Sequence, residues 1–357
     1  MPQFVPGLEL AREFYAEAVR PLLAARFPAL PYSAALLGPG SDVAGFDTER
    51  STDHDWGPRL QVFLSEQDAA RHAAAITAAL ADGLPASFRG YPVAFPLTSE
   101  PSVSRHRVQV AGLGEWLTGK LGFDPCRAVT LTDWLAVPTQ RLLEVTAGQV
   151  FHDEPGELTR ARARLDWYPR EVWLYLLACQ WQRIAEEEAF PGRCAEMGDE
   201  LGSAVVTARL ARDLMRLCLL MHRRYPPYSK WLGTAFAQLP GAAAVSAPLT
   251  AAIAATSWPD RQQHLCQAWE ATAAIHNQLG LTQPVDTRSR PFYDRPFQVL
   301  DAGRFTAALR QDITDPLLRQ LPVAGAVDQY IDSTAVLVDI GLLRAATEAI
   351  FAPLPRH

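Results

Sequence analysis

The chain has none of the features that mark secreted or membrane proteins. Its five cysteines are odd in number and include no Cys-x-x-Cys pair, which argues against a disulfide framework and against structural zinc. No basic stretch followed by an apolar run opens the sequence, so we expect no secretory signal. The alanine-rich stretch 242–255 is too short for a membrane span and is broken by Pro248. These absences predict a soluble cytoplasmic protein with no membrane partner.

Excess basic charge is also missing. The formal net charge is -6 and the sequence pI is about 5.8, whereas proteins that grip nucleic acid usually carry a basic face. Arg160, Arg162 and Arg164 lie close together, but their spacing distributes them around a helix and predicts an exposed surface. We therefore expect a small-molecule or protein partner rather than nucleic acid. The sequence leaves the oligomeric state open.

Lysine is nearly absent: only two of the 33 basic side chains are lysines, Lys120 and Lys230. Lys230 lies in the segment Tyr228-Ser229-Lys230-Trp231. A lysine retained where arginine fills almost every basic position indicates that a compact point charge matters, as it does at a phosphate. The competing interpretation is a surface lysine near the start of a helix, and the sequence does not decide between them.

Apolar patterns in the first part of the chain predict a small mixed sheet with helices beside it. We expect a helix over 8–27, bent near Pro21, and an alanine-rich helix over 66–80. Strands are predicted over 33–37, 60–64, 85–95 and 105–111. With 357 residues, 48% of them hydrophobic, the chain can bury a large core, and we place a first domain at 1–130.

From about residue 132 onward strand patterns nearly vanish and long helical patterns take over. Helices are predicted over 157–167, 170–189, 199–225, 229–239, 260–279 and 334–351, with a loop over 283–298. Prolines punctuate these segments where helices stop or restart. The fold class is therefore α+β, a mixed-sheet domain followed by a mostly helical domain at 131–357.

Two short motifs in the first domain indicate phosphate and metal chemistry. Gly40-Ser41 follows the first strand, where glycine allows close approach of the backbone and Ser41 adds a hydroxyl donor. Asp53 and Asp55 precede the second strand, and on a strand such a pair would aim both carboxylates at one point. A divalent cation, normally Mg²⁺, relieves their repulsion and also binds triphosphate oxygens. The alternative without a function is a solvated loop in which the acids only form turns.

This pattern resembles the signature of the DNA polymerase beta-like nucleotidyltransferase superfamily: an apolar residue, Gly-Ser, a spacer, then Asp-x-Asp. More narrowly, Asp47-Thr48-Glu49-Arg50-Ser51-Thr52-Asp53-His54-Asp55-Trp56-Gly57 is similar to a bacterial family of unknown function assigned to that superfamily. The resemblance continues through Leu143 to Gly148, Gln180 to Ile184 and Tyr228 to Trp231, so it covers most of the chain.

The resemblance implies a third carboxylate on a later strand and a lysine or arginine of the helical domain on the triphosphate. Lys230 matches the second feature. The strand 105–111 contains no acid, and Gln109 stands where glutamate is expected. His54 also replaces the usual apolar residue between the two acids. The predicted metal site therefore has two carboxylates rather than three.

Together these features predict an adenylyltransferase-type enzyme that transfers a nucleoside monophosphate to a hydroxyl of a small molecule or protein. The first expectation is transfer of AMP from ATP. Asp53 and Asp55 would hold Mg²⁺, with Mn²⁺ as the alternative, while Gly40, Ser41 and Lys230 position the phosphates. The main alternative is a nucleotide-binding or protein-interaction module of the same fold that has lost turnover. A tRNA acceptor would need a basic stripe that the net charge does not promise.

Three further charged segments have simpler explanations. The segment 114–121 matches a phosphate-binding loop in its glycines and Lys120, but Leu121 replaces the required Ser or Thr, so we reject it. Arg209, Arg212 and Arg216 share one helix face, where a salt-bridged surface is the first expectation and the binding of phosphates or an acidic partner is the alternative. In the run 186–188 we expect solvated acids, with a catalytic base as the alternative.

Overall fold

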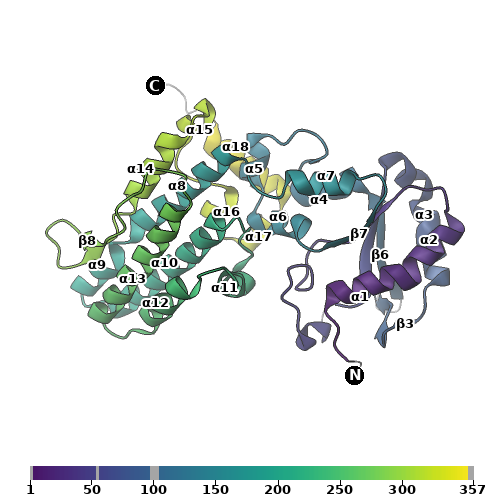
Figure 1. Ribbon diagram of the computed structural model, residues 1–357, viewed down its shortest axis with the longest axis horizontal. Coiled ribbons are helices and arrows are strands. Elements are labelled where there is room, and N and C mark those ends of the chain that lie inside the picture. The colour runs from purple at the N-terminus through teal and green to yellow at the C-terminus, as the bar shows by residue number, and fades with distance from the viewer. Residues whose placement is uncertain (1–2, 54–55, 97–103, 353–357) are drawn as a thin grey trace. The chain divides into compact units, whose positions relative to one another are not determined.

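The computed structural model describes residues 3–53, 56–96 and 104–352, which divide into two compact units (Figure 1). The first unit comprises Met1–Asp133 and Arg141–Asp166, and the second comprises Trp134–Gln140 and Trp167–His357. The first unit thus takes in a segment that lies well beyond residue 130. The architecture is α+β, as predicted: a mixed sheet near the N-terminus followed by a mostly helical region.

The first unit is built around a five-stranded sheet with the strand order β5-β6-β2-β1-β7. Its strands are β1 Ser33–Leu36, β2 Arg59–Leu64, β5 Ala94–Pro96, β6 Ser104–Gly112 and β7 Gln149–Asp153. The β2 and β6 strands pair in parallel, and the other neighbours pair antiparallel. A two-stranded hairpin of β3 Ser87–Phe88 and β4 Tyr91–Pro92 lies between β2 and β5 in the sequence. The predicted mixed sheet is confirmed.

One strand of this sheet was not predicted. The segment of β7 falls where we expected only helices, yet it pairs antiparallel with β1, with a register shift between Ala34 and Ala35. Its last four residues are half-buried, as is usual for a strand at a sheet edge. An edge strand carries a weaker apolar pattern because only part of its surface is covered.

The N-terminal helix is interrupted as predicted, and the interruption is a π-turn. It consists of α1 Gly7–Phe14, a π-helix Tyr15–Val19 and α2 Arg20–Arg26. Pro21 lacks an N–H, so the helix cannot form its regular bond at that position. Directly before Pro21, the Arg20 N–H donates to the Tyr15 carbonyl, in the wider spacing of a π-turn.

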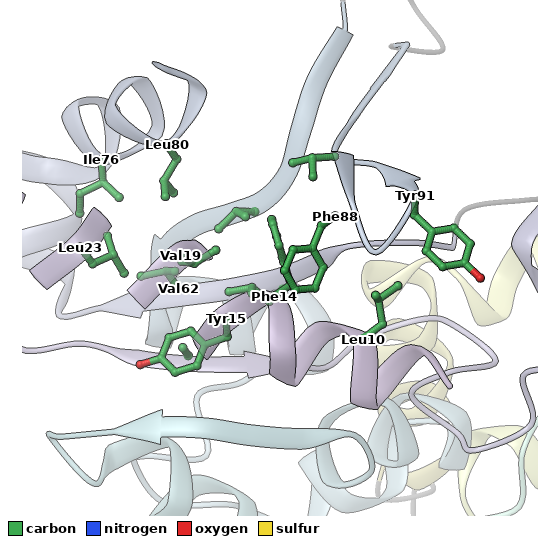
Figure 2. Packing of buried hydrophobic residues seen from close by; sticks show 14 of the residues in the cluster. Leu10, Phe14, Tyr15, Val19, Leu23, Val62, Ile76, Leu80, Phe88 and Tyr91 are labelled. Carbon is green, nitrogen blue, oxygen red and sulfur yellow. The ribbon is translucent and has the colours of Figure 1, made fainter. Parts of the chain in front are cut away.

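The core of the first unit lies between the sheet and its helices (Figure 2). Apolar side chains of α1, of the π-turn and of α3 Glu66–Gly83 meet those of β2, and Phe14 packs on Phe88 with ring centroids 5.3 Å apart. Ser65 fixes the start of α3 by accepting from the Asp68 N–H. Each large apolar side chain buried here contributes about 1.5–3 kcal/mol.

Shorter elements complete both units. In and next to the first unit they are α4 Leu113–Leu121, α5 Leu131–Ala136, α6 Thr139–Thr146 and α7 Glu157–Arg164. In the second unit they are α9 Phe190–Glu196, α11 Ser229–Ala237, α15 Pro316–Gln320, α16 Val327–Tyr330, β8 Arg290–Pro291 and β9 Gln298–Val299.

The second unit is a helical assembly. Its main helices are α8 Arg170–Glu187, α10 Glu200–Met221, α12 Ala243–Ala254, α13 Trp258–Gln278 and α14 Gly303–Asp312. The α8 helix is buried almost all round, and α10 packs against both α8 and α13 (Figure 1). Within this core Trp181 stacks on Phe305 with ring centroids 4.4 Å apart. No helix in the described part of the chain is long and apolar enough to span a membrane.

The C-terminal segment 334–351, which we predicted as one continuous helix, forms two helices. It is divided into α17 Thr334–Leu337 and α18 Ile340–Phe351. The Asp339 side chain accepts from the Leu342 N–H, so it caps the start of α18. An aspartate in this role favours a fresh helix start over a continuous helix.

Candidate functional site

Hydrogen bonds fix the start of the turn that follows β1. The buried side chain of Gln61 on β2 accepts from the Leu37 N–H at 2.9 Å and donates to the Leu37 carbonyl at 3.2 Å. The Gly38 N–H donates to the Glu144 carbonyl at 2.8 Å. Gly38 has φ +90°, so the chain leaves the strand in a conformation that glycine adopts without strain.

Gly40 is required by what packs against it. A Cβ at this position would collide with Asp42 Oδ1 and Arg59 Nη2, and the φ of +152° is itself unfavourable for other residues. Arg59 binds Asp42 through two contacts, Nη2 to Oδ1 at 2.7 Å and Nε to Oδ2 at 3.3 Å. It also donates to the Pro39 carbonyl at 3.1 Å. The turn is thus clamped by a bidentate ion pair.

The clamped turn leaves hydrogen-bond donors unused. Pro39 and Gly40 are exposed, and Ser41 is half-buried. Among the described residues nothing accepts from the backbone N–H of Gly40 or Ser41, or from the Ser41 hydroxyl. The Gly40 and Ser41 carbonyls, by contrast, accept from the Ala44 and Phe46 N–H groups. Free N–H groups beside exposed glycine backbone are typical of a site that binds an anion.

A cation that the sequence analysis missed lies beside this turn. Lys120, in the last turn of α4, places its Nζ 3.9 Å from the position that a Cβ of Gly38 would occupy. The neighbouring Trp116 packs edge-on against Phe63 of β2, with ring centroids 5.1 Å apart, and so attaches α4 to the sheet. We rejected the segment 114–121 as a phosphate-binding loop, and it is indeed a helix. The scarcity of lysine, which we applied only to Lys230, was the signal that pointed to Lys120.

The acidic motif falls at the border of the described residues. Asp55 and the side chain of Asp53 lie outside them, so their predicted roles stay predictions. The backbone of Asp53 ends a 3₁₀ helix, Glu49–Asp53, and β2 begins only at Arg59. The expectation that strand geometry aligns the two acids is therefore wrong at Asp53. Local bonds explain the turn, because Thr52 Oγ1 donates to the Glu49 carbonyl at 2.7 Å.

The chain is anchored again directly after this motif. Trp56 is buried and packs edge-on against Tyr91, with ring centroids 4.9 Å apart. Its Nε1 donates to Asp47 Oδ2 at 3.0 Å, and the same oxygen accepts from the Gly7 N–H at 2.7 Å. Asp47 therefore links the start of α1 to the end of the acidic motif and plays a structural part.

No third carboxylate appears where the resemblance implies one. Gln109 lies on β6 in register with Gln61 of β2, and its side chain is exposed. Elsewhere in the described ranges no three His, Cys, Asp or Glu side chains form a group that could hold a metal ion. Glu115, the nearest acid downstream, is exposed in the first turn of α4.

Lys230 belongs to the second unit, whereas Gly40 and Ser41 belong to the first. It is exposed at the start of α11, and its Nζ lies 5.0 Å from the centroid of the Trp231 ring. The role of Lys230 on the triphosphate stays a prediction.

Two of the clustered arginines, Arg162 and Arg164, bond to backbone carbonyls. Arg162 is half-buried, contrary to the predicted exposed surface, whereas Arg164 is exposed, as predicted. Arg162 donates to the Val145, Thr146 and Ala147 carbonyls at 3.1, 2.6 and 3.0 Å, and so closes the C-terminal end of α6. Burial lowers the pKa of Arg162 from its ordinary value. Arg164 Nη1 donates to three loop carbonyls at 2.8 Å, those of Pro125, Cys126 and Arg127. Helix spacing alone does not reveal such contacts.

Of the remaining charged segments, one confirms its prediction and one contradicts it. The arginine face of α10 is salt-bridged as expected: Arg209 pairs with Glu187 at 2.9 Å, and Arg216 pairs with Asp328 at 2.8 Å. Glu188, expected in solvent, is buried and accepts from the Leu300, Asp301 and Ala302 N–H groups. Burial raises its pKa to about 7, while these three backbone donors act in the opposite direction. These hydrogen bonds give Glu188 a structural role, in which it anchors the start of α14, rather than the role of a catalytic base.

Comparison with known proteins gives one family match. Residues 134–232 match the model of a domain of unknown function (DUF4037), and the motifs at 143–148, 180–184 and 228–231 all fall within them. No curated protein matches. A nucleotidyltransferase-like protein from Exiguobacterium sibiricum 255-15 is similar at 12% identity and a TM-score of 0.30, over 88% of this chain and 91% of that chain. The resemblance to a family of unknown function is thus confirmed for the matched segment.

Proposed function

We propose that this protein is a metal-dependent nucleotidyltransferase that transfers AMP from ATP to a hydroxyl of a small molecule or a protein. The observation that carries the proposal is the clamped turn after β1. Its exposed glycine backbone presents the Gly40 and Ser41 amides and the Ser41 hydroxyl with no acceptor among the described residues. Donors arranged in this way suit the oxygens of a triphosphate. The sequence adds Asp53 and Asp55 downstream of the turn, in the order that the superfamily signature has.

Each proposed residue has a distinct part. Gly40 and Ser41 donate to phosphate oxygens, and the sequence adds Lys230 as a further cation for the phosphates. Asp53 and Asp55 supply hard anionic oxygens, which suit Mg²⁺ or Mn²⁺ because such ions keep several waters beside one or two carboxylates. A bound cation would offset the charge that develops as pyrophosphate leaves. The turn holds the phosphate chain in one orientation toward the acceptor hydroxyl.

The test combines calorimetric titration of ATP and Mg²⁺ with detection of pyrophosphate in the same samples. We expect the wild type to bind ATP in a metal-dependent manner and to release pyrophosphate once an acceptor is present. The variant Asp53→Asn/Asp55→Asn should lose both properties. Asp82→Asn, an exposed carboxylate in the last part of α3, is the control for a change of surface charge and should behave as the wild type. Failure of the wild type to bind any nucleoside triphosphate would reject the proposal.

A second function is favoured by one observation, the exposed Gln109 in place of an acid on β6. With only two carboxylates, the fold would serve as a nucleotide-binding or protein-interaction module without turnover. Metal-dependent ATP binding without pyrophosphate release, across a panel of hydroxyl acceptors, would favour this module. Release of pyrophosphate with any acceptor would exclude it.

A further inference from the structure

We propose that Lys120, in the last turn of α4, binds a phosphate group seated on the turn 38–41. This inference deepens the proposed function, since the phosphate would be one of the nucleotide's own. It concerns a residue of the same unit as the turn, so the geometry that supports it lies within one compact body.

The position of Lys120 is fixed by the elements around it. The β6 strand ends at Gly112, in register with Leu64 at the end of β2, and α4 follows directly. The helix then returns along the sheet, because Trp116 contacts Phe63 and the last turn reaches Gly38. Arg141 Nη1 donates to the Lys120 carbonyl at 2.8 Å, which holds the end of the helix. The backbone that carries the ammonium group is therefore fastened on two sides.

The ammonium group itself is uncommitted. No hydrogen bond or ion pair joins Lys120 Nζ to any other described residue. Its one contact of note is with the Trp116 ring, 5.7 Å from Nζ to the centroid. The half-buried side chain thus holds a positive charge against an aromatic face, 3.9 Å from the Cβ position that Gly38 leaves empty. A Cβ there would lie in van der Waals contact with the ammonium group and with the Trp116 ring.

The other cation at this turn cannot take the same role. The guanidinium of Arg59 already donates to both carboxylate oxygens of Asp42 and to the Pro39 carbonyl. Lys120, by contrast, is a cation beside the turn whose donors bond to no other described residue. A lysine provides a point charge that can follow a phosphate oxygen on a flexible stem. Together with the unused Gly40 and Ser41 N–H groups, it makes a site for a phosphate or polyphosphate anion.

The first experiment uses the rarity of lysine. The full-length protein is acetylated slowly with and without inorganic tripolyphosphate, and modification at Lys120 and Lys230 is followed by mass spectrometry. Tripolyphosphate should slow acetylation of Lys120 at least several-fold. In parallel, tripolyphosphate affinity is measured for the wild type, Lys120→Gln and Lys120→Arg. Loss of one charge-assisted contact should weaken binding about 10- to 100-fold in Lys120→Gln, and Lys120→Arg should keep most of the affinity.

Arg26→Gln, at the exposed end of α2, removes the same charge from the same unit and should bind as the wild type does. Unchanged thermal unfolding of Lys120→Gln shows that the variant is folded. Equal acetylation of Lys120 with and without tripolyphosphate, or equal affinity of Lys120→Gln and the wild type, would overturn the inference. If MgATP binding and pyrophosphate release also persist in Lys120→Gln, the proposed function stands without it. If tripolyphosphate protects Lys120 but MgATP never binds, the inference stands and the proposed function fails.

Discussion

The substitution Asp42→Asn tests whether the ion pair below the glycine turn holds the turn in place. The exposed fractions of the Asp42 and Arg59 side chains are 2% and 13%, so the pair is largely removed from water. Removing one partner of a buried pair costs about 3–5 kcal/mol of unfolding free energy. Asparagine keeps an oxygen that accepts from the Val43 N–H at 2.9 Å, and Arg59 keeps its bond to Pro39. We therefore expect a loss of about 2–3 kcal/mol.

Urea unfolding measures this loss, and hydrogen exchange assigns it to the first unit. A change of 2–3 kcal/mol corresponds to a shift of about 1 M in the urea midpoint. Amides of the segment 43–46 should exchange faster in the variant than in the wild type, because the turn opens locally. Glu9→Gln removes one partner of an exposed pair, Glu9 with Arg12 at 3.8 Å, and should leave the midpoint unchanged.

Two results would refute the reasoning. One is a midpoint for Asp42→Asn that coincides with that of Glu9→Gln. The other is strict additivity in a double-mutant cycle with Arg59→Gln, since two side chains that form a bidentate pair must show a coupling energy.

The other predictions concern the turn, a buried acid and a buried arginine. Gly40→Ala should destabilise the first unit by about 1–3 kcal/mol in urea unfolding and weaken tripolyphosphate binding, because the new Cβ meets Asp42 and Arg59. Gly45→Ala is the control for backbone strain alone, since Gly45 has φ +72° and open space around it. Burial raises the pKa of Glu188 to about 7 from an ordinary 4.5, so its contribution to stability is full below pH 4.5 and is lost as pH rises through 7. Glu188→Gln should flatten that part of a Tm-against-pH profile, and an unchanged profile would contradict the assignment. Arg162→Met should cost about 2 kcal/mol in urea unfolding through three lost carbonyl partners, whereas Arg160→Met, with a single bond to Pro155, should cost much less.

The parts of the fold that the sequence predicted are those with a strong apolar period. The strands β1 and β2 have buried, mostly apolar runs, and the helices α8, α10 and α13 are long enough for their pattern to be clear. The glycine turn was predictable as a turn because Gly38-Pro39-Gly40 allows little else. Its use as a phosphate site stays a prediction.

The rest depended on contacts that no local pattern encodes. The edge strand β7 owes its conformation to β1, more than a hundred residues earlier in the sequence. The 3₁₀ helix at 49–53 arises from side chains that bond to nearby backbone, which apolar periodicity does not register. Lys120 reaches Gly38 only because α4 returns along the sheet, and Glu188 is buried only because the loop 300–302 folds over it.

The division of the chain into two units has a consequence for the domain of unknown function itself. The chain passes from one unit to the other three times, after residues 133, 140 and 166. The family segment 134–232 therefore contains helices of one body and β7 of the other. Expressed alone, it would carry β7 without β1, its partner in the sheet, and leave an edge of backbone donors and acceptors unpaired. The ends of the matched segment are thus no boundary at which this protein can be cut, and the chain is best studied whole.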